Sequence, residues 1–141
     1  MMVLDTSGLL ALLDSGEREH ARSSDAVRKD RGPLVVIDFV LAETDYLVLH
    51  RLGRAAERGF LAQLLEGVFL REAVTDADLR RAQEIAERFG DQDLGLTDAS
   101  LMAVTERLDG HKVLTLDRRH FAPFLDRRGR PLDLHPAAPA R

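Results

Sequence analysis

The chain of 141 residues contains no cysteine, which excludes disulfide bonds and thiolate metal sites and makes a cytoplasmic location the default expectation. No apolar run reaches the roughly 20 residues that a membrane-spanning helix needs. The N-terminus has no basic segment and soon meets an acid, Asp5, so we expect no signal peptide. These absences predict a soluble protein that is not held at a membrane.

Common catalytic motifs are missing as well. The sequence has no G-x-S-x-G, no phosphate-binding P-loop and no G-x-G-x-x-G. Its five histidines lack the H-x-x-x-H and H-x-H spacings, so we do not expect a zinc site. Any chemistry must therefore be sought in other residue types.

Charge is the next guide to function. The formal net charge is -4, so the molecule as a whole is not a basic nucleic-acid binder. The C-terminal part is nevertheless rich in arginine: Arg118, Arg119, Arg127, Arg128, Arg130 and Arg141 stand against only Asp126 and Asp133. Two interpretations stay open for this cluster, a solvated surface or a rim that grips a polyanion.

Apolar segments alternate with helical patterns along the chain. We expect strands at 2–4, 34–37, 68–70 and 113–114, and a short fifth strand at 131–134. The helical patterns lie at 6–15, 17–29, 39–52, 54–65, 76–89 and 97–108, with Thr6 or Ser7, Asp38 and Thr97 as candidate N-caps. This order predicts one α/β domain over 1–141, a three-layer α/β/α fold with a mostly parallel sheet of four to five strands. Residues 136–141 are expected to fray.

Three acids occur where ligand sites form in parallel α/β sheets. Asp5 ends the first strand, Asp98 lies in the first turn of a helix, and Asp117 follows the apolar strand near 113–116. The carboxyl ends of strands and the starts of the following helices share one edge of such a sheet. Each acid alone is equally well explained as a helix cap or a turn residue.

Glu43 is a fourth candidate. Its spacing from Val40 and Leu47 predicts that it lies on the apolar side of its helix, whereas Asp45 would face solvent. A buried glutamate needs a partner, either a salt bridge to an arginine such as Arg51 or Arg54, or a cation.

Four converging carboxylates would repel one another unless a positive charge lay between them, and Mg²⁺ or Mn²⁺ is the cation that oxygen ligands prefer. Ser7 and Thr115 are candidates to hold a water or a carboxylate in such a site. Asp91 and Asp93 are either accessory acids or part of a polar loop, and the sequence does not choose between these.

Four segments together resemble the PIN-domain family, and in particular the VapC toxins of bacterial toxin–antitoxin pairs. They are VLDTS (3–7), VLAE (40–43), LTDASL (96–101) and LTLDRRHF (114–121). The resemblance covers essentially the whole chain, in order and with typical spacing. One departure is Asp38, where a Ser or Thr cap is more usual in the family.

This resemblance implies a Mg²⁺- or Mn²⁺-dependent ribonuclease. The metal-binding and catalytic residues carried over are Asp5, Glu43, Asp98 and Asp117. It also implies a homodimer that a cognate antitoxin silences by occupying the acidic cleft. The mechanistic hypothesis is in-line attack on RNA by a water activated by one or two metal ions, leaving a 5′-phosphate and a 3′-hydroxyl.

Other classes of function remain open. A phosphoacceptor signalling domain would need adjacent acids after the first strand and a lysine after the last one, but the only lysines are Lys29 and Lys112. A D-x-D phosphatase would need an acid at position 7, which is Ser7. A non-catalytic binding module that keeps its acids is not excluded, and the RNA target is left open among tRNA, rRNA and mRNA.

Overall fold

A five-stranded parallel sheet lies at the centre of the structure, a computed structural model that describes residues 1–90 and 93–140. Its strands are β1 (Met2–Leu4), β2 (Leu34–Ile37), β3 (Leu70–Glu72), β4 (Lys112–Leu114) and β5 (Asp133–His135). The spatial order is β3-β2-β1-β4-β5, and every neighbouring pair is parallel. The predicted α/β fold is confirmed.

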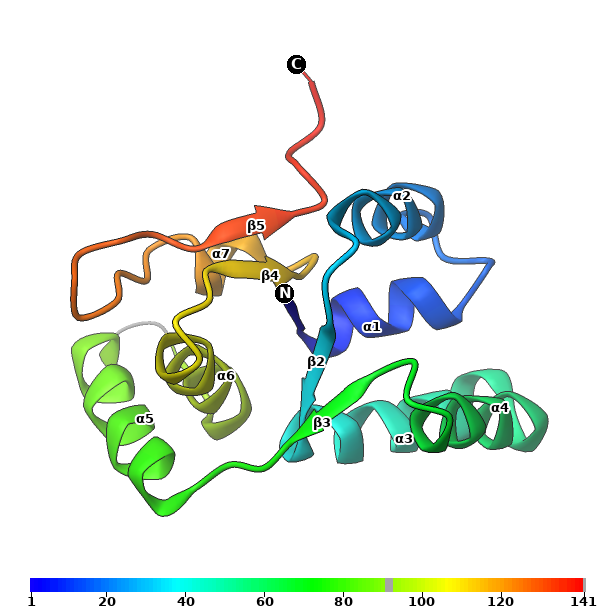
Figure 1. Cartoon of the computed structure of the whole chain (residues 1–141), viewed down its shortest axis with the longest axis horizontal. Helices are drawn as coiled ribbons and strands as arrows, with labels where there is room; N and C mark the ends of the chain where they lie inside the picture. Colours follow the sequence, from blue (N-terminus) through cyan, green and yellow to red (C-terminus); the bar gives the residue numbers. More distant parts are fainter. Residues whose placement is uncertain (91–92, 141) are drawn as a thin grey trace.

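Helices cover both faces of the sheet. They are α1 (Thr6–Leu13), α2 (His20–Asp30), α3 (Asp38–Leu52), α4 (Arg54–Leu65), α5 (Asp76–Arg88), α6 (Leu96–Arg107) and α7 (Arg118–Phe121). The chain steps from β1 to β3 in one direction and then returns to β4 on the other side of β1. Because such crossovers are right-handed, α1 to α4 lie on one side of the sheet and α5 and α6 on the other (Figure 1).

The sheet is apolar on both sides because helices cover both sides. Met2, Val3 and Leu4 of the central strand are completely buried, and Phe121 and Phe124 fill the core as their apolar character predicts. No helix in the described part of the chain combines the length and the apolar character that crossing a membrane requires.

The strand order reverses at β1. The connection from β1 to β2 runs over one face of the sheet, and the connection from β3 to β4 runs over the other. In open α/β sheets this reversal opens a crevice at the carboxyl ends of the strands. Asp5 directly follows β1, and Asp117 lies three residues beyond the end of β4. The topology therefore places both acids at the crevice.

Several predicted boundaries are wrong. β3 begins at Leu70 rather than at residue 68, because the amide of Val68 donates to the carbonyl of Gln63 and so belongs to the turn that ends α4. β5 begins at Asp133 rather than at residue 131, and α2 begins at His20 rather than at residue 17. The amide of His20 donates to the Glu17 carbonyl, in a turn that precedes the helix.

The predicted N-caps are also wrong. The N-cap positions of α1, α3 and α6 are occupied by Asp5, Ile37 and Gly95, not by Thr6 or Ser7, Asp38 and Thr97. None of these three helices has a side-chain cap, because each begins where an extended segment turns directly into the helix. Only α5 has a full capping box, formed by Thr75 and Asp78, among the helices of the described chain.

Gly8 lets α1 lie against β4. A Cβ atom at this position would stand 2.3 Å from the carbonyl oxygen of Leu114, which is backbone and cannot move aside cheaply. We predict that Gly8→Ala lowers the free energy of unfolding by about 1–3 kcal/mol or more. Gly59 of α4 has nothing within 4 Å of its added Cβ, so Gly59→Ala is expected to stabilise the helix by roughly 0.5–1 kcal/mol. Urea denaturation of the two variants checks this pair, and equal effects would contradict it.

Candidate active site

A cavity of about 560 Å³ opens at the carboxyl edge of the sheet, between the starts of α1 and α6 and one side of α3. We call it the acid pocket. Its lining comprises Asp5, Thr6, Ser7, Leu10, Glu43, Leu47, Arg51, Asp93, Gly95, Leu96, Thr97, Asp98 and Asp117. All four acids that the sequence singled out therefore line one cavity, although they come from four distant segments.

Asp5 is held at the bottom of this pocket by two hydroxyl groups. Asp5 is only 5% exposed. Its Oδ2 accepts hydrogen bonds from Ser7 Oγ at 3.0 Å and from Thr115 Oγ1 at 2.8 Å. Burial raises the pKa of Asp5, and the bonds from Thr115 and Ser7 partly oppose that rise. The prediction that these two hydroxyls hold a carboxylate is confirmed.

The same two hydroxyls join the turn after β1 to the turn after β4. Ser7 Oγ accepts from the amide of Leu116 at 2.9 Å, and Thr115 Oγ1 accepts from the amide of Asp117 at 2.9 Å. The position of Asp5 relative to Asp117 is therefore fixed by a short hydrogen-bonded network.

Asp117 caps α7, as one interpretation of the sequence proposed, and it also lines the acid pocket. One residue binds both of its carboxylate oxygens: the His120 amide donates to Oδ1 at 3.4 Å, and His120 Nδ1 donates to Oδ2 at 2.6 Å. The bond to Asp117 raises the pKa of His120, and Asp98, whose Oδ2 lies 3.8 Å from Nδ1, adds to the rise.

Sequence reasoning missed His120. Spacings between histidines do not point to His120, and the informative spacing is that between His120 and an acid three residues before it. A side chain three residues after an N-cap reaches back to the cap, so Asp117 followed by His120 was the available signal.

The surroundings of Asp98 raise the pKa of its carboxyl group. Its pKa is raised to about 6, first because the side chain is desolvated and next because of the charge of Asp5. The charges of Asp117 and Glu43 raise it further, while His120 lowers it. Each of the other three acids thus acts electrostatically on Asp98, in agreement with the place of all four in the lining of the acid pocket.

A metal ion would find ligands here. Asp98, Asp117 and His120 each offer one ligand atom, and within the described residues these atoms lie within 4.8 Å of one another. Carboxylate oxygens suit hard divalent cations, and imidazole nitrogen suits transition metals, so the donor set is compatible with Mg²⁺ and with Mn²⁺.

Glu43 reaches the pocket by a different route from the one predicted. The buried stripe of α3 is Val40, Thr44 and Val48, at a strict spacing of four, and Glu43 is exposed on the flank that faces the cavity. Asp45, expected in solvent, is instead partly buried. The apolar-stripe interpretation was wrong because it did not allow a threonine to take a core position.

Four arginines of the C-terminal cluster bind groups outside the acid pocket. Arg118 donates to the carbonyl oxygens of Leu134 and Pro136 and so fastens the end of β5. Arg127, Arg128 and Arg130 pair with acids outside the pocket. The arginine in the pocket lining is Arg51. Of the two interpretations left open for the C-terminal cluster, these contacts favour the surface for Arg118, Arg127, Arg128 and Arg130. Arg119 is exposed and its charge acts on His120, and Arg141 and Asp91 lie outside the described residues.

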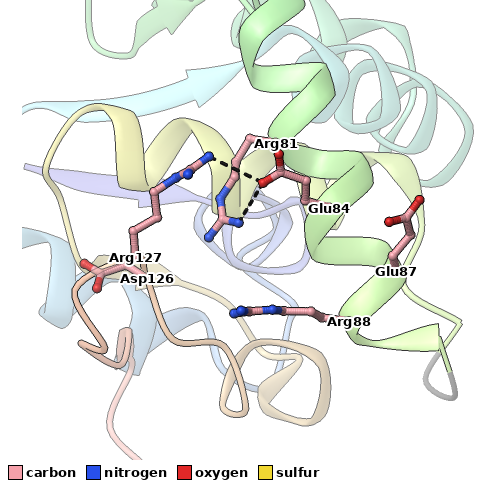
Figure 2. A pocket seen from close by; sticks show the side chains of 6 residues that line it. All are labelled: Arg81, Glu84, Glu87, Arg88, Asp126 and Arg127. Atoms are coloured by element: carbon pink, nitrogen blue, oxygen red, sulfur yellow. Dashed lines mark hydrogen bonds and ion pairs between the residues drawn. The ribbon is translucent and has the colours of Figure 1, made fainter.

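A larger cavity, of about 680 Å³, lies between α5 and the loop after α7 (Figure 2). Arg81 and Arg127 both reach Glu84 there, at 3.1 and 3.4 Å, and both also pair with Glu106 of α6. Opposite charges neutralise one another in this network, which joins α5, α6 and the loop after α7. The acid pocket lacks that balance and is the better candidate for a functional site.

The raised pKa of Asp98 makes a prediction about stability. An Asp whose pKa rises from about 3.8 in the unfolded chain to about 6 in the folded protein stabilises the fold at low pH and loses that contribution as the pH rises to 6. In metal-free buffer, Asp98→Asn should therefore raise the melting temperature at pH 7.5, and the gain should be much smaller at pH 4. Glu87→Gln, on the exposed side of α5, is the matched control. A lower melting temperature for Asp98→Asn at pH 7.5 would contradict the prediction.

Comparison with known proteins agrees with this geometry. The family model described as PIN domain matches residues 2–124. Ribonuclease VapC26 of Mycobacterium tuberculosis (strain ATCC 25618 / H37Rv) is 38% identical over 121 residues, which are 86% of this chain and 90% of that protein.

Two solved structures show the same fold. VapC20 of Mycobacterium tuberculosis, titled a Sarcin-Ricin loop cleaving toxin, superposes with a TM-score of 0.79 at 24% identity and covers 87% of this chain and 95% of its own. VapBC2 of Rickettsia felis, bound to a promoter DNA fragment, has a TM-score of 0.67 at 14% identity and covers 95% and 96%. The match over 2–124 and the 38% identical relative show that the chain belongs to the PIN domain family, among its VapC-like members.

Proposed function

We propose that this protein is an endoribonuclease that cleaves RNA phosphodiester bonds in the acid pocket with the help of a divalent cation. The observation that carries the proposal is the convergence of Asp5, Glu43, Asp98 and Asp117 on one cavity, where burial and mutual repulsion raise the pKa of Asp98 to about 6. Support also comes from the relative at 38% identity, which is named a ribonuclease.

The residues present fit a divalent cation. Asp98 and Asp117 would be its ligands, and Asp5 and Glu43, which line the same cavity, would complete the oxygen set directly or through water. When bound, Mg²⁺ or Mn²⁺ supplies positive charge that offsets the scissile phosphate and lowers the pKa of the attacking water.

The protein's own groups orient this site. Ser7 and Thr115 fix one carboxylate, and His120 fixes another, so neither must reorganise when substrate arrives. Arg51 is placed to bind a phosphate oxygen of the RNA backbone at the α3 wall. In-line attack by water in this arrangement leaves a 5′-phosphate and a 3′-hydroxyl.

Structures of similar fold also support a proposal about the partners of this chain. Related folds include the complex titled a toxin-antitoxin complex from Klebsiella pneumoniae, with a TM-score of 0.70 at 18% identity, and the VapBC2 assembly. We infer that a cognate antitoxin silences this chain in the cytoplasm, and that the chain forms a homodimer.

The phosphoacceptor alternative finds no support in the lysines. Lys112 binds Asp30 at 2.7 Å and Lys29 binds Asp25 at 2.8 Å, so both are engaged away from the acid pocket. The non-catalytic alternative differs from the proposal only in activity, which the following experiment measures.

Single substitutions in the pocket should abolish cleavage without unfolding the protein. Asp5→Asn and Asp98→Asn are each expected to lower the rate of RNA cleavage with Mn²⁺ by at least about 100-fold, because each removes charge that positions the cation. Glu87→Gln should cleave at the wild-type rate. A gel assay on RNA, with melting curves beside it, checks the set. Full activity in Asp98→Asn would overturn the assignment, and an inactive wild type would favour the binding module.

Cation binding should be visible without any substrate. Millimolar Mg²⁺ or Mn²⁺ is expected to raise the melting temperature of the wild type at pH 7.5, because a ligand that binds only the folded state stabilises it. The rise should be lost in Asp98→Asn and kept in Glu87→Gln. Equal shifts in all three proteins would mean that the ions bind elsewhere.

A further inference from the structure

An exposed aromatic pair lies on α3. Tyr46 is 60% exposed, and its ring stacks on that of His50, with centroids 4.1 Å apart and an angle of 30° between the rings. His50 is exposed as well. The buried stripe of the helix passes through Val40, Thr44 and Val48, so the fold does not need this pair for its core.

The pair borders the acid pocket. Glu43, Leu47 and Arg51 line the pocket at a spacing of four along α3. Tyr46 and His50 follow Glu43 by three and seven residues, which places them beside that row on the helix surface. The stacked rings therefore form the next row on the α3 surface, outside the lining of the pocket itself.

The rings are held in place before any ligand arrives. His50 Nδ1 donates to the carbonyl oxygen of Tyr46 at 2.8 Å, since a carbonyl can only accept. This bond keeps the imidazole against the tyrosine ring, and it leaves Nε2 as the free acceptor of the neutral ring. A surface fixed in this way loses little conformational entropy when a flat group stacks on it.

We propose that Tyr46 and His50 form a stacking platform for one unpaired nucleobase of the RNA substrate. The base lies next to the scissile phosphate, and Arg51 binds the RNA backbone between the base and that phosphate. This inference rests on the proposed function and adds to it a contact between named residues and a base that is not paired. A base inside a duplex is already stacked on its neighbours and cannot reach an aromatic side chain.

The charge of the pocket favours this occupant. Five carboxylates line the cavity and Arg51 is the arginine in its lining, so phosphate contacts alone bind a polyanion weakly there. Stacking on an aromatic ring needs no opposite charge and tolerates any base. The platform thus supplies the affinity that the acidic pocket lacks.

Cleavage kinetics test the platform. On a random-sequence pool of single-stranded RNA, Tyr46→Ala is expected to raise KM about tenfold, the size of one lost base–aromatic contact, with a much smaller effect on kcat. Tyr46→Phe keeps the ring and should stay near the wild-type KM. Leu65→Ala, at a side chain that is 88% exposed on α4, is the matched surface control.

The chain also offers a direct binding signal. It has no tryptophan and Tyr46 is its one tyrosine, so its intrinsic fluorescence reports this residue alone. In the Asp98→Asn protein, a single-stranded RNA 12-mer should quench that fluorescence, because a stacked base quenches tyrosine. The same RNA in a duplex, and heparin as a polyanion without bases, should not.

The outcomes separate the platform from the nuclease. Quenching by heparin or by duplex equal to that by single-stranded RNA overturns the platform. So does an unchanged KM in Tyr46→Ala while Asp98→Asn is inactive, and in that case the nuclease proposal stands. A change of oligomeric state in Tyr46→Ala, measured by light scattering, marks the pair as a protein interface and also overturns the platform. Selective quenching by single-stranded RNA, without cleavage by the wild type or any variant, supports the platform and contradicts the nuclease proposal.

Discussion

Repulsion among carboxylates is the constraint on which this structure depends. Asp5 and Asp98 are drawn out of water beside two further acids, and both have raised pKa values as a result. An arrangement of this kind weakens the fold near neutral pH unless a cation offsets it. The acid pocket therefore sacrifices some stability of the ligand-free chain for a site that binds positive charge, a common trade at functional sites.

The rest of the fold holds these repelling groups in place. The reversal of strand order at β1 brings the turns after β1 and β4 together, and Gly8 allows α1 to lie directly on the β4 backbone. Ser7 and Thr115 then connect the two turns through Asp5, while His120 fixes the other acid of this edge. The contrast with the balanced ion pairs of Figure 2 shows that the acids gather here without equal compensation. The balance of opposite charges therefore distinguishes the two cavities.

Individual residues show why sequence reasoning reached part of this site and missed the rest. Asp5 and Asp98 were found because strand ends and helix starts are local features that apolar runs reveal. Glu43 was found, but on the wrong side of its helix, because the pattern alone did not show that Thr44 would be buried. His120 was missed because only spacings between histidines were considered, whereas its partner is Asp117, the helix cap three residues before it.

The sequence by itself determined the class of fold, the order of strands and helices, and the set of acids, because hydrophobic periodicity and residue type are written directly in the chain. The register of α3, the engagement of the C-terminal arginines with the end of β5 and other acids, and the pairing of Tyr46 with His50 were decided only by tertiary structure. The physical reason is that each depends on which surfaces become buried together. That choice is made by packing across the whole domain, and no local segment contains it.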